Sequence, residues 1–347
     1  MTLSPLANPS HARQTPSFSP KQVLKILISV VLLGFLLQHI GLENVLHKLS
    51  KANLWYIPVG VVVYLVGQLI SAYRWQFLSA ALNFKLALRE FYDYYLIGMF
   101  FNLFLPGAIG GDVLRLYYLA KSTGRRKREA LLTLLAERGV GLVALLLLTS
   151  AVCLSPALQD SHLAIPITLP FLNQPLIFDL SVLLVFLSTL LLLGYFCLWL
   201  VPLQALTQKF PKLALLDQAK VYWANLGLLA KSVSISLFVH AMMIVMHLLI
   251  AQALHTSVNP FYMTVVYGVV SLASVLPIAF NGFGVREGAY LLLLTKAGLQ
   301  PDTALAFAVY WDIISTCTSL IGGLVLLKGH YKTPTAAEQA DLSEELA

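Results

Sequence analysis

The chain has 347 residues, of which 58% are hydrophobic and only 11% are charged, against about 25% charged residues in an ordinary soluble domain. Its apolar residues gather in blocks of about 20, the length at which a helix spans a bilayer. These properties exclude a cytosolic enzyme, a secreted module and a DNA-binding domain, and they predict a multi-spanning membrane protein. The net charge of +7 fits the basic loops of such a protein better than a nucleic-acid partner.

The predicted elements follow one another along most of the chain. Residues 1–20 are rich in Pro and Ser and predict a disordered tail, 21–330 form the membrane domain, and 331–347 form a second tail. Residues 41–53 place Leu at helical spacing beside Lys, which is typical of a helix on the membrane interface. The apolar blocks are 23–40, 54–72, 91–106, 129–154, 176–202, 231–254, 261–280 and 303–327.

Lys and Arg mark the cytoplasmic side of a membrane protein because they resist translocation. The basic stretches are the N-terminal tail, 73–90, 115–128, 205–231 and the C-terminal tail. The connections 152–178 and 255–260 contain no Lys or Arg and are expected outside. Both termini are therefore expected in the cytoplasm.

The block at 91–106 lies between two basic stretches, so a full crossing would place one of them on the wrong side. The block is short, and helix-breaking residues follow it, namely Pro106, Gly107, Gly110 and Gly111. We therefore predict a hairpin that enters and leaves the membrane on the cytoplasmic side.

The same conflict returns at 261–296, where Pro277, Gly282 and Gly284 interrupt the apolar pattern and predict a hairpin from the outer side. Broken hairpins from opposite faces are typical of inverted repeats with a binding site near the midplane. The sequence thus predicts an all-α polytopic membrane protein with six full spans and two re-entrant hairpins. Eight full spans are the alternative.

Charged side chains at membrane depth are costly and usually functional. Asp112 and Arg115 follow the first break one helical turn apart, and Arg286 and Glu287 follow the second. The exposed N–H groups at such half-helix starts favour an anion site. The alternatives are an N-cap role for Asp112 and tight helix packing for the glycines.

Other polar residues complete the candidate site. Glu137 lies two turns inside a predicted span, where its carboxylate requires a basic partner, and the candidates are Arg115, Arg138, which follows it, and Arg286. Asn102 and Asn281 adjoin the two breaks and are expected to satisfy freed backbone groups or to line the cavity. The substrate-binding candidates are Asn102, Gly107, Gly110, Gly111, Asp112, Arg115, Glu137, Arg138, Asn281, Gly282, Gly284, Arg286 and Glu287, with Pro106 and Pro277 as structural breaks.

Several further residues are interpreted as structural. Arg74 and Asp312 are assigned to the membrane interface, and His240 and His247 share a helix face without a third metal ligand nearby. The sequence has no ATP-binding loop, serine-hydrolase elbow or zinc-protease pair. We therefore expect no catalytic residue, cofactor or metal.

The motifs resemble those of the lysylphosphatidylglycerol synthase transmembrane-region family, also called flippase-like or UPF0104 membrane proteins. The matching stretches are 101–115, 137–139 and 277–288, together with Arg74-Trp75. The resemblance implies a multi-pass protein of a bacterial or archaeal cytoplasmic membrane that moves amphipathic lipids between leaflets. No soluble aminoacyl-transferase domain follows the last predicted span, which puts a lysyl-lipid substrate and transferase activity in doubt.

We therefore expect a lipid translocase in which a polar groove shelters an anionic or lipid-linked head group. The expected substrate is a phospholipid or a polyprenyl- or hopanoid-type lipid. Arg115 and Arg286 would hold its phosphate, while Asp112, Glu137 and Glu287 position the arginines or contact an amine. Lipid-synthesis enzymes and a second copy of the chain are candidate partners. The alternatives are a membrane-embedded transferase or synthase accessory and a secondary transporter of a small anion.

Overall fold

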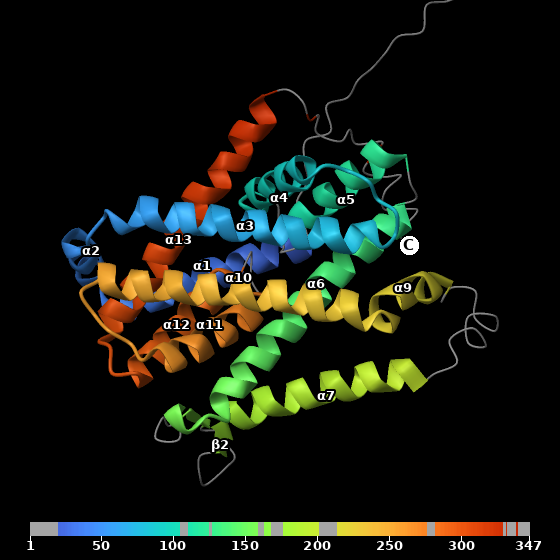
Figure 1. Ribbon diagram of the computed structural model, residues 1–347. Coiled ribbons are helices and arrows are strands. Elements are labelled where there is room, and N and C mark those ends of the chain that lie inside the picture. The colour runs from blue at the N-terminus through green and yellow to red at the C-terminus, as the bar shows by residue number, and fades with distance from the viewer. Residues whose placement is uncertain are drawn as a thin grey trace, which may run out of the picture.

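The structure is a computed structural model, and it describes residues 20–104, 110–124, 127–158, 163–167, 176–200, 214–275, 282–328, 331 and 338. Nearly all of this part of the chain is helical (Figure 1). Residues 1–19 of the tail predicted at 1–20 lie outside the described residues, and so do four residues that the sequence singles out, Pro106, Gly107, Pro277 and Asn281.

Long apolar helices form the frame of the bundle. Four of them have the length and composition to cross a membrane by themselves, namely α3 (Tyr56–Ala80), α6 (Lys127–Cys153), α10 (Leu226–Ala253) and α13 (Pro301–Leu327). Two apolar helices of 21 residues each, α1 (Pro20–Ile40) and α7 (Leu180–Leu200), lie beside this frame. The predicted multi-spanning helical membrane protein is confirmed.

Two pairs of short helices occupy the places where the sequence predicts broken hairpins. The first pair is α4 (Leu88–Asn102) and α5 (Gly110–Thr123), and the second is α11 (Pro260–Val275) and α12 (Val285–Lys296). At 1.5 Å per residue each helix is only about 18–24 Å long, which is shorter than the hydrocarbon core of about 30 Å. These lengths favour the prediction of six spans and two hairpins over eight spans.

The two halves of the bundle repeat one order of elements: a long helix, a broken hairpin and a second long helix. Helices α3 and α10, the first of each half, pack along each other (Figure 1). The remaining contacts correspond between the halves. The contact of α3 with α13 corresponds to that of α10 with α6, and the contact of α4 with α13 corresponds to that of α11 with α6. The backbone N–H of Asn53, just before α3, donates to the carbonyl oxygen of Ala253 at the end of α10 at 2.9 Å. The halves therefore run in opposite directions, as an inverted repeat requires.

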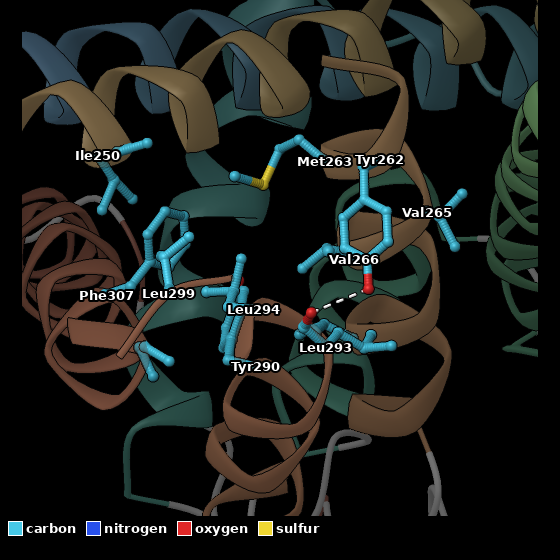
Figure 2. Close-up of a cluster of buried hydrophobic side chains, with 14 of the residues drawn as sticks. Ile250, Tyr262, Met263, Val265, Val266, Tyr290, Leu293, Leu294, Leu299 and Phe307 are labelled. Atoms are coloured by element: carbon cyan, nitrogen blue, oxygen red, sulfur yellow. Dashed lines mark hydrogen bonds between the residues drawn. The ribbon is translucent and has the colours of Figure 1, made fainter. Parts of the chain in front are cut away.

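The second hairpin is anchored in an apolar core between α10, α11, α12 and α13 (Figure 2). Met263, Leu294 and Phe307 are completely buried there. The hydroxyl of Tyr262 donates to the carbonyl oxygen of Leu293 at 2.9 Å, the dashed line in Figure 2, and so ties α11 to α12. Lipid tails are as apolar as these side chains, so close packing rather than exclusion of water stabilises such a core.

The first hairpin instead brings two backbones together. Gly98 of α4 faces Gly111 of α5, and a methyl group at Gly111 would meet the carbonyl oxygen of Gly98. The side-chain oxygen of Asn102 accepts a hydrogen bond from the N–H of Gly111 at 2.8 Å. Gly111 therefore serves the tight packing that is the alternative interpretation of the glycines, and Asn102 satisfies a backbone group at the start of α5.

The interfacial helix predicted at 41–53 is present as α2 (Leu42–Lys51). Its Val45 is buried against α13, while Leu42 and Leu46 are exposed, as an amphipathic helix at an interface requires. Helix α9 (Ala214–Ala224) lies within the basic connection before α10, where the sequence predicts no element.

Two boundaries differ from the sequence predictions. Helix α3 continues to Ala80, so Arg74 lies inside a helix and not in the basic loop predicted at 73–90. A charged residue usually marks the end of a span, but Arg74 pairs with the carboxylate of Glu137 inside the bundle.

Helix α7 begins at Leu180, because the apolar residues before it form the second strand of a small antiparallel hairpin. This hairpin, made of β1 (Ala164–Ile167) and β2 (Leu176–Asp179), follows the short 3-10 helix Pro156–Leu158. A short apolar run does not distinguish a strand from a helix, which explains why the predicted start of this block at residue 176 was wrong.

Candidate functional site

Glu137 of α6 lies at the centre of a buried group of charges. Its Oε1 atom pairs with Nη2 of Arg74 from α3, and its Oε2 atom lies 3.5 Å from Nη2 of Arg115 from α5. The hydroxyl of Tyr95, from α4, donates to Oε1 at 2.7 Å. The basic partner that this carboxylate requires is thus supplied by two arginines from different helices.

A second carboxylate extends this group toward the surface. Oδ1 of Asp112 lies 3.1 Å from Nη1 of Arg115, and Oδ2 pairs with Nη2 of Arg138, whose side chain is 45% exposed. Asp112 is also in the first turn of α5, where its negative charge interacts favourably with the positive end of the helix dipole. We call the five residues Arg74, Asp112, Arg115, Glu137 and Arg138 the arginine cluster; its three guanidinium groups and two carboxylates leave one positive charge.

Aromatic rings hold the central guanidinium of this cluster in place. The Cζ atom of Arg115 lies 4.4 Å from the ring centroid of Trp75 and 3.7 Å from that of Tyr95, so two cation–π contacts supplement its ion pairs. Within the described part of the chain, the buried Nε atoms of Arg74 and Arg115 have no hydrogen-bond partner, as is also true of Nε of Arg286. Buried polar groups usually have a partner, so the Nε donors of Arg74 and Arg115 are candidates for a hydrogen bond to a ligand.

The second hairpin carries a smaller group of charges that also involves α13. Nη2 of Arg286 lies 3.2 Å from Oε1 of Glu287 and also pairs with Oδ1 of Asp312. Oε2 of Glu287 accepts a hydrogen bond from the N–H of Gly284 at 2.5 Å and so caps the start of α12. We call Arg286, Glu287 and Asp312 the carboxylate cluster, because two carboxylates share one guanidinium group.

Two cavities adjoin one another between the hairpins. A cavity of about 580 Å³ is lined by the arginine cluster, and one of about 380 Å³ is lined by Arg286 and by uncharged aromatic and hydroxyl side chains. Four residues line both, namely Tyr95, Met99, Asn102 and Ser271. These volumes are within the range of ligand-binding pockets, and the shared wall joins the first hairpin to the second.

The sequence predicts that free backbone N–H groups at the starts of α5 and α12 bind an anion, and the structure differs from this prediction. Among the described residues, the carboxylate of Glu287 caps α12 and the amide oxygen of Asn102 accepts from Gly111 at the start of α5. The basic residues that line the larger cavity are Arg74, Arg115 and Arg138. Gly282 and Gly284 have φ angles of 76° and 85°, which favour glycine in the turn before α12.

The structure divides the predicted site residues between two places. Asp112, Arg115, Glu137 and Arg138 lie together, whereas Arg286 and Glu287 belong to the other cluster. Arg74, Tyr95 and Asp312 are missing from the prediction. Arg74 and Asp312 were assigned to the interface, although a charge inside an apolar helix was the signal for both.

Both histidines make two hydrogen-bond contacts each. His240 contacts the carbonyl oxygen of Gly141 at 3.0 Å and the hydroxyl of Tyr267 at 2.8 Å. His247 contacts the carbonyl oxygen of Met243 at 2.7 Å and the hydroxyl of Tyr290 at 2.7 Å. In the part of the chain that the structure describes, no three His, Cys, Asp or Glu side chains are placed to hold a metal ion.

Comparison with known families agrees with this architecture. The model of the lysylphosphatidylglycerol synthase transmembrane region matches residues 22–323, which include both hairpins and both clusters. The chain belongs to this family. The resemblance seen in the motifs is thereby confirmed.

Curated relatives of this lysylphosphatidylglycerol synthase transmembrane-region protein include UPF0104 membrane proteins of three archaea. The identity is 26% over 119 residues for Methanocaldococcus jannaschii, 27% over 120 residues for Pyrococcus horikoshii and 29% over 121 residues for Methanothermobacter thermautotrophicus. Each match covers 34–35% of this chain and 35–36% of the relative. The chain therefore spans about a third of the length of the relatives that it matches.

Proposed function

We propose that the protein is a lipid translocase that binds an anionic head group at the arginine cluster and moves it across the cytoplasmic membrane. The observation that carries the proposal is the composition of the larger cavity. One wall is the arginine cluster, and another is formed by the apolar side chains of Leu135, Leu142, Leu272 and Val275. A ligand with one anionic and one apolar part fits such a cavity.

The apolar wall supports a lipid rather than a small soluble anion. The side chains of Leu135, Leu142 and Val275 line this cavity and are 40–64% exposed. In a membrane these surfaces face acyl chains. A lipid can therefore place its phosphate beside the guanidinium groups while its tails remain in the bilayer.

The charge of the cluster supports an anionic head group. The buried guanidinium groups of Arg74 and Arg115 are balanced by two buried carboxylates, and the half-exposed Arg138 adds one positive charge that an anionic head group would neutralise. The unpartnered Nε atoms of Arg74 and Arg115 are additional donors for phosphate oxygens. Arg138, half-exposed at the edge of the cluster, is placed to meet the head group first.

The paired hairpins suggest the path of the head group. The larger cavity adjoins the smaller one through their shared wall, and the two hairpins enter from opposite ends of the bundle. Movement of one half of the inverted repeat against the other would expose the head group first to one side and then to the other. In this proposal both termini are cytoplasmic, the protein makes or breaks no covalent bond, and the movement is downhill or ion-coupled.

Proteoliposomes with fluorescent reporter lipids test the proposal. We expect faster exchange between leaflets than in protein-free vesicles for at least one anionic reporter among phosphatidylglycerol, aminoacylated and polyprenyl-phosphate lipids. Exchange equal to that of protein-free vesicles for all of these reporters would contradict the proposal. Conversion of a reporter into a new product would favour a transferase, and uptake of free phosphate that ignores lipid composition would favour an anion transporter.

A further inference from the structure

The two clusters carry opposite net charges. The arginine cluster has three guanidinium groups and two carboxylates, whereas the carboxylate cluster has one guanidinium group and two carboxylates. With all groups ionised the two sums cancel, so the two clusters together are neutral. An anionic head group at the arginine cluster would leave one negative charge without compensation.

The uncompensated negative charge lies at the carboxylate cluster. Both carboxylates of the carboxylate cluster contact one nitrogen atom, Nη2 of Arg286. The second oxygen of Glu287 is taken by the N–H of Gly284, and the Glu287 side chain is almost completely buried. Two carboxylates that converge on one donor repel each other in a medium of low dielectric constant, and a proton on one of them removes that repulsion.

The smaller cavity, which Arg286 lines, has no second cation among its described lining residues. Apart from Arg286, the described side chains that line the smaller cavity are uncharged or are histidine and tyrosine, and the titratable ones are Tyr64 of α3, Tyr95 of α4, His247 of α10, Tyr267 of α11 and Tyr290 of α12. Helix α1 meets the start of α12 through Ser29 and Leu32, beside Gly284. His247 is held between the carbonyl oxygen of Met243 and the hydroxyl of Tyr290.

We propose that Glu287 and Asp312 form a proton-binding pair that is loaded together with an anionic head group. This inference rests on the proposed function for the identity of that head group. Proton binding converts one carboxylate into a carboxylic acid, which donates its O–H to the other, and no other bond changes. Asp312 is the entry point, because its side chain is 20% exposed whereas that of Glu287 is 1% exposed.

The cavities provide a physical route for this coupling. A head group beside Arg115 adds a negative charge that raises the affinity of the neighbouring pair for a proton, and the bound proton raises the affinity for the head group by the same factor. Four residues, among them Tyr95 and Asn102, line both cavities, and the member of the carboxylate cluster that lines the smaller cavity is Arg286, which contacts both carboxylates.

A proton fits this pair better than a metal ion does. Ca²⁺ and Mg²⁺ take six or more ligands, chiefly oxygens, whereas one oxygen atom of Glu287 is already occupied by a backbone N–H. The guanidinium of Arg286 lies in contact with both carboxylates, where it repels a metal ion. A proton needs one oxygen lone pair only.

Infrared spectroscopy of the purified protein in lipid nanodiscs tests the pair without any transport assay. We expect a carboxylic-acid C=O band that disappears as the pH is raised and that is lost in both Asp312→Asn and Glu287→Gln. The matched control is Asp302→Asn, the same chemical change on the same helix at a site that pairs with Lys48 at 3.8 Å. A band that persists in both site variants, or that is lost only in His247→Gln, would overturn the proposal.

Transport in proteoliposomes tests the coupling. For one proton per lipid, a gradient of one pH unit is expected to shift the distribution of a phosphatidylglycerol reporter between leaflets by up to about tenfold. Asp312→Asn should abolish this shift, whereas the Asp302→Asn control keeps both the shift and the exchange. A shift that follows a Na⁺ gradient at equal pH would overturn the proton as the coupling ion. Absence of any exchange would contradict the proposed function instead, and the infrared band would then decide the proton pair alone.

Discussion

Glu137 and Arg74 form an ion pair between α6 and α3 although they are 63 residues apart in the chain. Both side chains are almost fully buried, and Nη1 of Arg74 also donates to the hydroxyl of Ser236 on α10 at 2.6 Å. Three long helices of the frame therefore meet at one guanidinium group. The pair positions the arginine cluster and stabilises the centre of the bundle.

Replacement of Arg74 by Met is therefore expected to destabilise the protein. The change leaves Glu137 with a single guanidinium partner, and removal of one member of a buried ion pair costs about 3–5 kcal/mol. We expect a clearly lower midpoint of thermal unfolding in detergent than for the wild type. The control is Arg89→Met, because Arg89 is 79% exposed and lies 4.0 Å from its partner Asp93. Equal midpoints for the two variants would contradict this role of Arg74.

Replacement of Gly111 by Ala is expected to force α5 away from α4. The added methyl group would meet the carbonyl oxygen of Gly98, and backbone atoms cannot turn aside as a flexible side chain does. We expect lower thermal stability and slower reporter-lipid exchange. Gly194→Ala on α7 is the control, since nothing lies within 4 Å of a methyl group there. A Gly111→Ala protein as stable and active as this control would refute the close backbone contact.

If both helix pairs are re-entrant hairpins, the two ends of each pair face the same side of the membrane. Lys85 and Gly124 flank the α4–α5 pair and are expected to face the same side of the membrane, whereas Thr256 and Gln300 flank the α11–α12 pair and face the other. Single cysteines at these positions, in a chain whose three native cysteines are replaced, should react with an impermeant reagent accordingly. Labelling of positions 85 and 124 from opposite sides would instead support eight full spans.

Arg138 is expected to act differently from the buried arginines of its cluster. Its side chain is 45% exposed and its partner Asp112 keeps a second ion pair with Arg115, so Arg138→Gln should leave the thermal midpoint nearly unchanged. Loss of one charged hydrogen bond to a phosphate corresponds to about 1.5–3 kcal/mol, or roughly 10- to 100-fold in head-group affinity. Binding of a phosphatidylglycerol reporter to nanodisc-embedded protein measures this effect, with the exposed Lys220→Gln as control.

The order of spans and breaks was accessible from the sequence because it depends on local composition. Runs of apolar residues, the Pro and Gly interruptions and the one-sided placement of Lys and Arg each act within a few residues. The proximity of Asp112 and Arg115 was predictable for the same reason, since residues three apart share a helix face. Glu137 was identified because a lone acid in an apolar span needs a partner.

Arg115 was one of three partners predicted for Glu137, but the pairs that involve Arg74 and Asp312 were not predictable from local patterns. Arg74 meets Glu137 across 63 residues and Arg286 meets Asp312 across 26, so both pairs depend on how each helix is rotated about its axis. A helix that is apolar around its whole circumference gives no hydrophobic face from which that rotation can be read. The neighbours of Arg74 and Asp312 therefore became known only from helix packing.

The exchange rate of an anionic reporter lipid in Arg115→Gln proteoliposomes tests the central claim most directly. Arg115 contacts Asp112 and Glu137 and is held between two aromatic rings, so it is the cation that the head group is proposed to meet at the centre of the site. We predict exchange at least about tenfold slower than in wild-type vesicles, the effect of one lost charged hydrogen bond, with the Lys220→Gln control unchanged. Wild-type exchange rates in a folded Arg115→Gln protein would contradict the account.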